Sequence, residues 1–173
     1  MPLQAKIHAI SVTVAGRLSI VARPRGADWL EDEIDALRRA GVNVLVSALT
    51  RAEEDELGLL DECDVCRRLG VGHIGLPIND RDVPSTTEPA GSVIRALALK
   101  IESGASIAVH CRQGIGRSGL ITAAILCVLG SSPADAFARV EEARGRPVPD
   151  TQAQIDWVAR FATSLSIPSS DQG

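Results

Sequence analysis

The sequence predicts a single α/β domain with a central, mostly parallel sheet flanked by helices, an N-terminal β-hairpin and a C-terminal helical cluster. Short apolar runs of strand length alternate with segments whose apolar residues recur at helical spacing, which is typical of βαβ units. The chain has 173 residues, 45% of them hydrophobic, which is enough for one compact core. We expect the domain to span residues 1–165 and residues 166–173 to form a flexible tail, because the tail lacks any apolar pattern.

The first elements are a hairpin and a helix. Residues 6–14 and 17–23 are rich in β-formers on either side of Ala15-Gly16, which predicts two antiparallel strands. Asp28 stands where it could cap a helix, whose apolar residues recur at helical spacing until Gly41 ends it.

Two further strands are expected in the first half. The near-continuous apolar run 42–49 predicts a strand covered on both faces, and residues 71–78 predict a second strand. A polar loop, 79–85, follows the second strand. Between the strands, apolar side chains after the acidic segment 53–56 predict one helical stripe that turns both cysteines to the core: Leu59, Cys63, Cys66 and Leu69.

The second half predicts one more strand and four helices. The strand covers 105–110, and a helix over 92–101 precedes it. Residues 118–130 carry no charge, which predicts a helix buried on every side. Ser132-Pro133 predicts the start of the next helix, and the last one opens at Asp150 or Thr151.

The stretch 106–119 combines a strand, a glycine-bearing loop and the start of the uncharged helix. Gly114 and Gly116 allow the backbone between Cys111 and Arg117 to curl, so that several N–H groups point at one anion. The helix behind the loop adds unpaired donors and the positive end of its dipole. We therefore assign phosphate binding to the residues of this loop: Arg112, Gln113, Gly114, Ile115, Gly116 and Arg117.

Cys111 faces the phosphorus atom in this interpretation. A helix N-terminus and nearby cations favour the thiolate, which is the nucleophilic form of cysteine. Arg117 offers a planar fork for two phosphoryl oxygens, and Ser118 lies close enough in sequence to donate its hydroxyl to the sulfur. These residues predict two-step phosphoryl transfer through phosphocysteine, without a metal or another cofactor.

The departing oxygen needs a proton, so we expect a carboxylic acid over the cleft. Asp80 is the first candidate and Asp82 the second, because their loop and the Cys111 loop both leave carboxyl ends of parallel strands. A turn-forming role is the alternative for Asp80. The acidic pair Glu53-Glu54 fits a solvated face better than a partner for Arg117.

The pattern His110-Cys111-x-x-Gly114-x-x-Arg117-Ser118 resembles the signature of cysteine-based protein tyrosine and dual-specificity phosphatases. The likeness continues through Leu76-Pro77-Ile78-Asn79-Asp80, which resembles the general-acid loop of that family, and through Thr151-x-x-Gln154. Within that superfamily, the sequence resembles the compact dual-specificity-like branch, which includes kinase-associated phosphatase and its bacterial relatives.

The resemblance implies a role for each matched residue. Cys111 is then the nucleophile, Arg117 binds phosphate, Ser118 assists departure of the thiolate and Asp80 is the acid. Gln154 either helps to place water or only hydrogen-bonds the start of its helix.

Two features of the family pattern are missing. The chain has no tyrosine and 2% aromatic residues, so an aromatic wall for phosphotyrosine is not encoded in the usual way. We interpret Trp29 and Trp157 as packing residues. The loop also lacks the lysines found where phosphoinositides are the substrate.

Composition excludes several classes of function. A net charge of −4 argues against nonspecific nucleic-acid binding. The longest uncharged apolar run, 119–130, is shorter than the about 20 residues that cross a bilayer, so we expect no membrane partner. Four cysteines without an N-terminal signal peptide predict reduced thiols in the cytoplasm, and we interpret Cys63-x-x-Cys66 as core packing in preference to a metal or redox site.

The sequence thus predicts a monomeric, metal-independent phosphomonoester hydrolase that acts on phosphoproteins, with phosphotyrosine as the expected substrate. Two alternatives stay open. The chain could be a phosphoprotein-binding module without turnover, or a phosphatase of a small phosphorylated metabolite.

Overall fold

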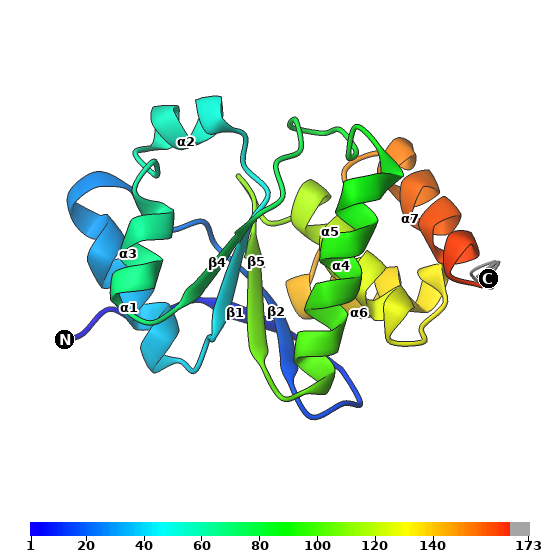
Figure 1. Cartoon of the computed structure of the whole chain (residues 1–173), viewed down its shortest axis with the longest axis horizontal. Helices are drawn as coiled ribbons and strands as arrows, with labels where there is room; N and C mark the ends of the chain where they lie inside the picture. Colours follow the sequence, from blue (N-terminus) through cyan, green and yellow to red (C-terminus); the bar gives the residue numbers. More distant parts are fainter. Residues whose placement is uncertain (167–173) are drawn as a thin grey trace, which may run out of the picture.

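The computed structural model describes residues 1–166 and contains one five-stranded mixed sheet (Figure 1). The strand order is β1-β2-β5-β3-β4. β1 (Ile7–Ile10) is antiparallel to β2 (Arg17–Val21), whereas β2, β5 (Ser106–His110), β3 (Val44–Ser47) and β4 (Gly72–Gly75) run parallel. The predicted α/β domain, with its mostly parallel sheet and N-terminal hairpin, is confirmed. Most of the expected tail, residues 167–173, lies outside the described residues.

Helices cover both faces of the sheet, as Figure 1 shows. One face carries α1 (Leu30–Arg39) and α3 (Glu62–Arg68), and the other carries α4 (Thr87–Glu102), α5 (Gly116–Val128), α6 (Pro133–Arg144) and α7 (Gln152–Leu165). The short α2 (Arg51–Leu57) follows β3. Each face has its own hydrophobic core, and α5 is buried from Gly116 to Cys127, as its uncharged sequence predicts.

The start of the chain differs from the prediction at two places. β1 ends at Ile10 instead of Val14, because Val12 and Val14 leave the sheet and pack against the larger core. Asp28 does not cap α1. The Ala27 N–H is bound to Gly58 O, so the chain enters α1 through a 3-10 turn (Ala27–Trp29) that contains Asp28.

The expected single helix after residue 53 is two helices. Gly58, at φ 70°, ends α2 in the left-handed region, and the connection to α3 changes the helical phase. Cys63 is therefore exposed, contrary to the prediction, while Cys66 is buried. Burial, with the charge of Glu62, raises the pKa of the Cys66 thiol to about 12.

The parallel strands bring three loops to one edge of the sheet. The segments that follow β3, β4 and β5 all leave carboxyl ends, and hence lie together. They lead respectively to Glu53, Asp80 and Cys111. In residues 1–166 no helix is both long and apolar enough to cross a bilayer.

Candidate functional site

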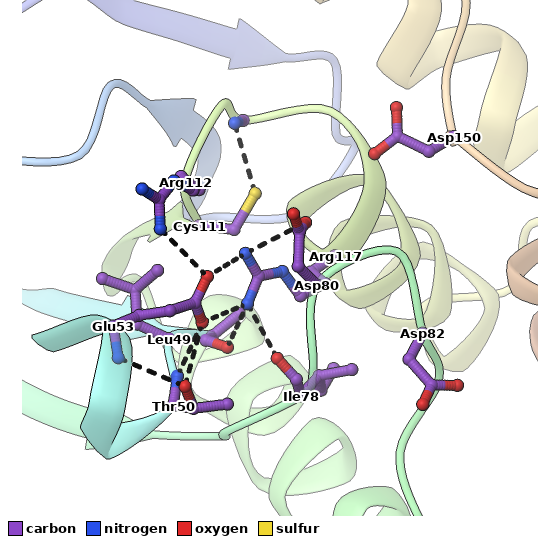
Figure 2. Close-up of polar contacts among 12 residues, drawn as sticks. Leu49, Thr50, Glu53, Ile78, Asp80, Asp82, Cys111, Arg112, Arg117 and Asp150 are labelled. Carbon is purple, nitrogen blue, oxygen red and sulfur yellow. Dashed lines mark hydrogen bonds and ion pairs between the residues drawn. The ribbon is translucent and has the colours of Figure 1, made fainter. Parts of the chain in front are cut away.

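The loop after β5 wraps around the Cys111 thiol. Cys111 is 3% exposed, and the Gly114 N–H donates a hydrogen bond to its Sγ at 3.2 Å (Figure 2). Gly114 has φ 71°, a conformation that L side chains rarely adopt, so glycine is needed for this turn. α5 then begins at Gly116 and directs the positive end of its dipole at the loop.

Arg144 of α6 holds the loop from outside. Its Nε donates to Gly114 O at 2.8 Å, and its Nη2 donates to Gln113 O at 3.5 Å. Its Nη1 also lies 2.6 Å from His8 Nε2 on β1. These carbonyl groups are thereby turned outward, which leaves loop N–H groups for the interior.

Arg117 is 1% exposed and its guanidinium is bound from several sides (Figure 2). Nη1 donates to Glu53 Oε2 at 2.7 Å and to Ile78 O at 2.7 Å, while Nη2 donates to Glu53 Oε1 at 2.9 Å. Burial alone would lower the pKa of Arg117, but the hydrogen bond with Glu53 and the charges of Cys111, Glu53 and Asp80 together outweigh it and raise the pKa above its ordinary value. The fork is therefore fixed in its charged form.

The prediction that Glu53 lies on a solvated face, and does not bind Arg117, is wrong. Glu53 is 9% exposed and belongs to a capping box in which its carboxylate accepts from Thr50 N at 3.0 Å. Burial alone would raise the pKa of Glu53, yet hydrogen bonds from Arg117 and Thr50 lower it to about 2. The capping box of α2 thus carries the carboxylate that orients Arg117.

The two aspartates of the loop after β4 point in different directions (Figure 2). Asp80 Oδ1 lies 3.3 Å from Arg117 Nη2, and the Asp80 side chain is 59% exposed. Asp82 Oδ1 instead accepts from Val83 N at 2.8 Å, and its side chain points away from the cysteine. The arrangement favours Asp80 over Asp82 as the residue above Cys111.

A cavity of about 100 Å³ lies in front of Cys111. It is lined by the nucleophile, by three of the loop residues expected to bind phosphate, by the acid candidate and by two further residues: Cys111; Gln113, Gly116 and Arg117; Asp80; Arg81 and Asp150. The cavity is small, and its lining combines a thiol, a guanidinium and carboxylates. None of the chain's four aromatic residues lines it.

Arg112 does not line the cavity. Its side chain turns toward α2, where Nη2 donates to Glu56 Oε1 at 2.7 Å and Nη1 lies 3.9 Å from Glu53 Oε1. Its backbone N–H remains part of the loop. Arg112 is thus placed to contribute through its backbone, with its side-chain charge balanced by acidic groups.

Ser118 and Gln154 are both fully buried. Ser118 Oγ makes no hydrogen bond with any group of residues 1–166, so the expected bond to the sulfur is not formed here. Gln154 Oε1 accepts from Asp150 N at 3.1 Å and from Thr151 N at 3.2 Å, and its Nε2 donates to Asp82 O at 3.1 Å. Gln154 therefore hydrogen-bonds its helix start and also joins it to the loop of Asp82.

The sequence reasoning missed a buried acid behind the nucleophile. Glu62 Oε2 accepts from His73 Nε2 at 2.9 Å. Its Oε1 lies 2.9 Å from His110 Nε2. Burial alone would raise the pKa of Glu62, but His110 and His73 outweigh it and lower the pKa to about 2. Nothing in the spacing of these residues predicts that they meet.

Asp150 was also missed as a site residue. Its position directly before the Thr151 cap predicts a helix start and does not by itself indicate a site residue. Its side chain lines the cavity with Cys111 and Asp80.

Comparison with known proteins agrees with this geometry. A family profile described as "Polymorphic toxin system, DSP-PTPase phosphatase" matches residues 20–131, which is more than half of the chain. The chain belongs to this DSP-PTPase family. The compact dual-specificity-like resemblance inferred from the sequence is thereby confirmed.

Relatives and solved structures extend the match. Cyclin-dependent kinase inhibitor 3 of Rattus norvegicus is 23% identical over 139 residues, which are 79% of this chain and 65% of that protein. The chain thus spans slightly less than two thirds of the curated relative's length.

Two solved structures share the fold. Kinase-associated phosphatase, with its catalytic-site cysteine replaced by serine, gives a TM-score of 0.85 at 20% identity over 95% of this chain and 98% of that one. Tk-PTP in its active form gives 0.73 at 26% identity over 94% and 99%.

Proposed function

We propose that this protein is a cysteine-dependent phosphomonoester hydrolase of phosphoproteins, acting on phosphotyrosine and on phosphoserine or phosphothreonine. The observation that carries the proposal is the buried Cys111 thiol, which accepts a hydrogen bond from the Gly114 N–H and lines a small cavity together with Arg117. Family membership and the phosphatase names of the neighbours support it.

In the first step, the Cys111 thiolate attacks phosphorus and the bond to the substrate oxygen breaks. The loop N–H groups and Arg117 stabilise the charge on the three equatorial oxygens. Asp80, as the acid, gives its proton to the departing oxygen. The products are phosphocysteine and the free hydroxyl of the substrate.

In the second step, the Asp80 carboxylate takes a proton from water. The water oxygen attacks phosphorus and the sulfur–phosphorus bond breaks. The phosphate is released and Cys111 returns as a thiolate. Ser118 is the proposed donor to that thiolate, since its buried Oγ has no other partner among residues 1–166. Gln154 acts in this proposal by holding the loops around the cavity.

We further propose that the protein works in the cytoplasm as a monomer. The four cysteines are free thiols, which suits a reducing compartment.

A phosphorylated metabolite is the second candidate substrate. No aromatic side chain lines the cavity, so nothing there selects a phenyl ester over an aliphatic one. A panel of phosphopeptides and of sugar, inositol and nucleotide phosphates would separate the two by kcat/KM.

The activity itself is tested with p-nitrophenyl phosphate in the presence of EDTA. We expect turnover by the wild-type protein and none by Cys111→Ser, with both proteins shown to be folded by their thermal unfolding. Turnover by Cys111→Ser would refute the proposed nucleophile, and an inactive, folded wild type would leave the binding module as the better account.

A further inference from the structure

Two carboxylates from different parts of the chain face the same cavity. Asp80 follows β4, and Asp150 precedes α7. Both line the cavity that contains Cys111 (Figure 2). A substrate phosphoryl group bound at Cys111 would therefore lie between two potential proton carriers.

The Asp150 carboxylate lies directly against the first residue of α5. A Cβ at Gly116 would overlap Asp150 Oδ2, so only glycine at this position leaves room for the carboxylate. Gly116 adjoins Arg117, the phosphate-binding residue of the proposal. Asp150 is thereby placed at the rim of the phosphate loop, within the part of the cavity that a phosphate ester would fill.

The backbone of Asp150 is fixed. Its N–H donates to Gln154 Oε1 at 3.1 Å, and Gln154 Nε2 donates to Asp82 O at 3.1 Å. One buried amide thus fastens both loops that carry the carboxylates. The loop of Asp150 is held in place in the same way as the loop of Asp80.

The two carboxylates differ in their partners. Asp80 Oδ1 lies 3.3 Å from Nη2 of the Arg117 guanidinium. The Asp150 carboxylate has no ion pair and no hydrogen bond with any group of residues 1–166. Asp150 is therefore free to exchange a proton with atoms bound in the cavity.

We propose that Asp150 is a second catalytic acid–base residue, which shares proton transfer with Asp80. The inference rests on the proposed phosphatase activity. Protonated Asp150 gives its proton to the oxygen that leaves phosphorus as the Cys111 sulfur bonds to it. The resulting carboxylate can then take a proton from the water that attacks phosphocysteine, which restores the acid.

The test compares four proteins: the wild type, Asp80→Asn, Asp150→Asn and the double variant. Each is assayed with p-nitrophenyl phosphate, whose leaving group needs little protonation, and with phenyl phosphate, whose leaving group needs it. General acid–base catalysis contributes about 10²- to 10⁴-fold. We expect each single variant to lose about tenfold or less in kcat/KM for phenyl phosphate, because the other carboxylate substitutes, and the double variant to lose about 10²-fold or more.

Asp156→Asn is the matched control. Asp156 is an exposed carboxylate of α7 that accepts from Gln152 Nε2 at 2.9 Å and does not line the cavity. It should retain wild-type kinetics with both substrates. Thermal unfolding of Asp150→Asn, whose backbone bond to Gln154 is kept, reports any loss of structure.

Two results would overturn the inference. One is a double variant no slower than Asp80→Asn on phenyl phosphate. The other is an Asp150→Asn effect that is equal for both substrates, since a structural or purely electrostatic role does not depend on the leaving group. The phosphatase proposal would survive either result if p-nitrophenyl phosphate is still hydrolysed by wild type and not by Cys111→Ser.

Discussion

Replacement of Glu53 by glutamine should weaken both the fold and the site. The change removes the charge that faces the Arg117 guanidinium across bonds of 2.7 and 2.9 Å. The pKa of Glu53 falls from 4.5 to about 2, which at about 1.36 kcal/mol per unit corresponds to roughly 3 kcal/mol. Breaking a buried ion pair from one side costs about 3–5 kcal/mol, which agrees. Asp80 would compensate little, because its carboxylate is 3.3 Å away and 59% exposed.

Urea unfolding at pH 7 measures this cost. We expect Glu53→Gln to lose about 3 kcal/mol, or about 6–12 °C in Tm for a domain of this size. We also expect kcat/KM to fall, because the guanidinium loses its fixed orientation. Asp55→Asn, an exposed carboxylate on the same helix, is the control and should change stability by less than about 0.5 kcal/mol. A Glu53→Gln protein as stable as Asp55→Asn would refute the reasoning.

Three further predictions follow from other contacts. Glu53 and Glu62 both have folded-state pKa values of about 2, below the ordinary 4.5. The stability that they contribute is therefore present above pH 4.5 and is lost as the pH falls toward 2. The free energy of unfolding should decrease from pH 4.5 to pH 2, and a flat profile would contradict this. Gln154→Ala should cost about 1–3 kcal/mol in urea unfolding, because two N–H groups lose their acceptor, and an unchanged midpoint would count against the role of Gln154 in joining the loops. Iodoacetamide should modify the exposed Cys63 in the native protein and spare Cys66 and Cys127. Burial raises the thiol pKa of Cys66 to about 12 and that of Cys127 to about 11, so neither forms the reactive thiolate readily. Equal labelling of Cys63, Cys66 and Cys127 on peptide mapping would be inconsistent with the structure.

Much of the site could be predicted because the topology of parallel strands determines which loops lie together. The carboxyl ends of parallel strands share one edge of the sheet, which predicts that Asp80 and Cys111 lie together although they are 31 positions apart in the sequence. In the structure both residues line one cavity. The uncharged run after Arg117 likewise predicted the buried helix that supports the loop. These inferences depend on local pattern and topology, which the sequence carries directly.

The contacts that were missed depend on where whole elements dock. Glu53 meets Arg117 only because Gly58 ends α2 and leaves that helix beside the loop, and the helical phase alone could not reveal this break. Asp150 reaches the cavity because Gly116 has no side chain there. Glu62 reaches His110 only after α3 has packed beside the sheet. Each of these pairs has a large sequence separation and no periodic signal.

Trapping of the covalent intermediate tests the central claim most directly. The wild-type protein is mixed with p-nitrophenyl phosphate, quenched in acid within the first turnover and digested for mass spectrometry. We predict a phosphoryl group on the peptide that contains Cys111, formed with a burst of p-nitrophenol and absent from Cys111→Ser. Turnover with no burst and no phosphoryl group on that peptide would contradict the account.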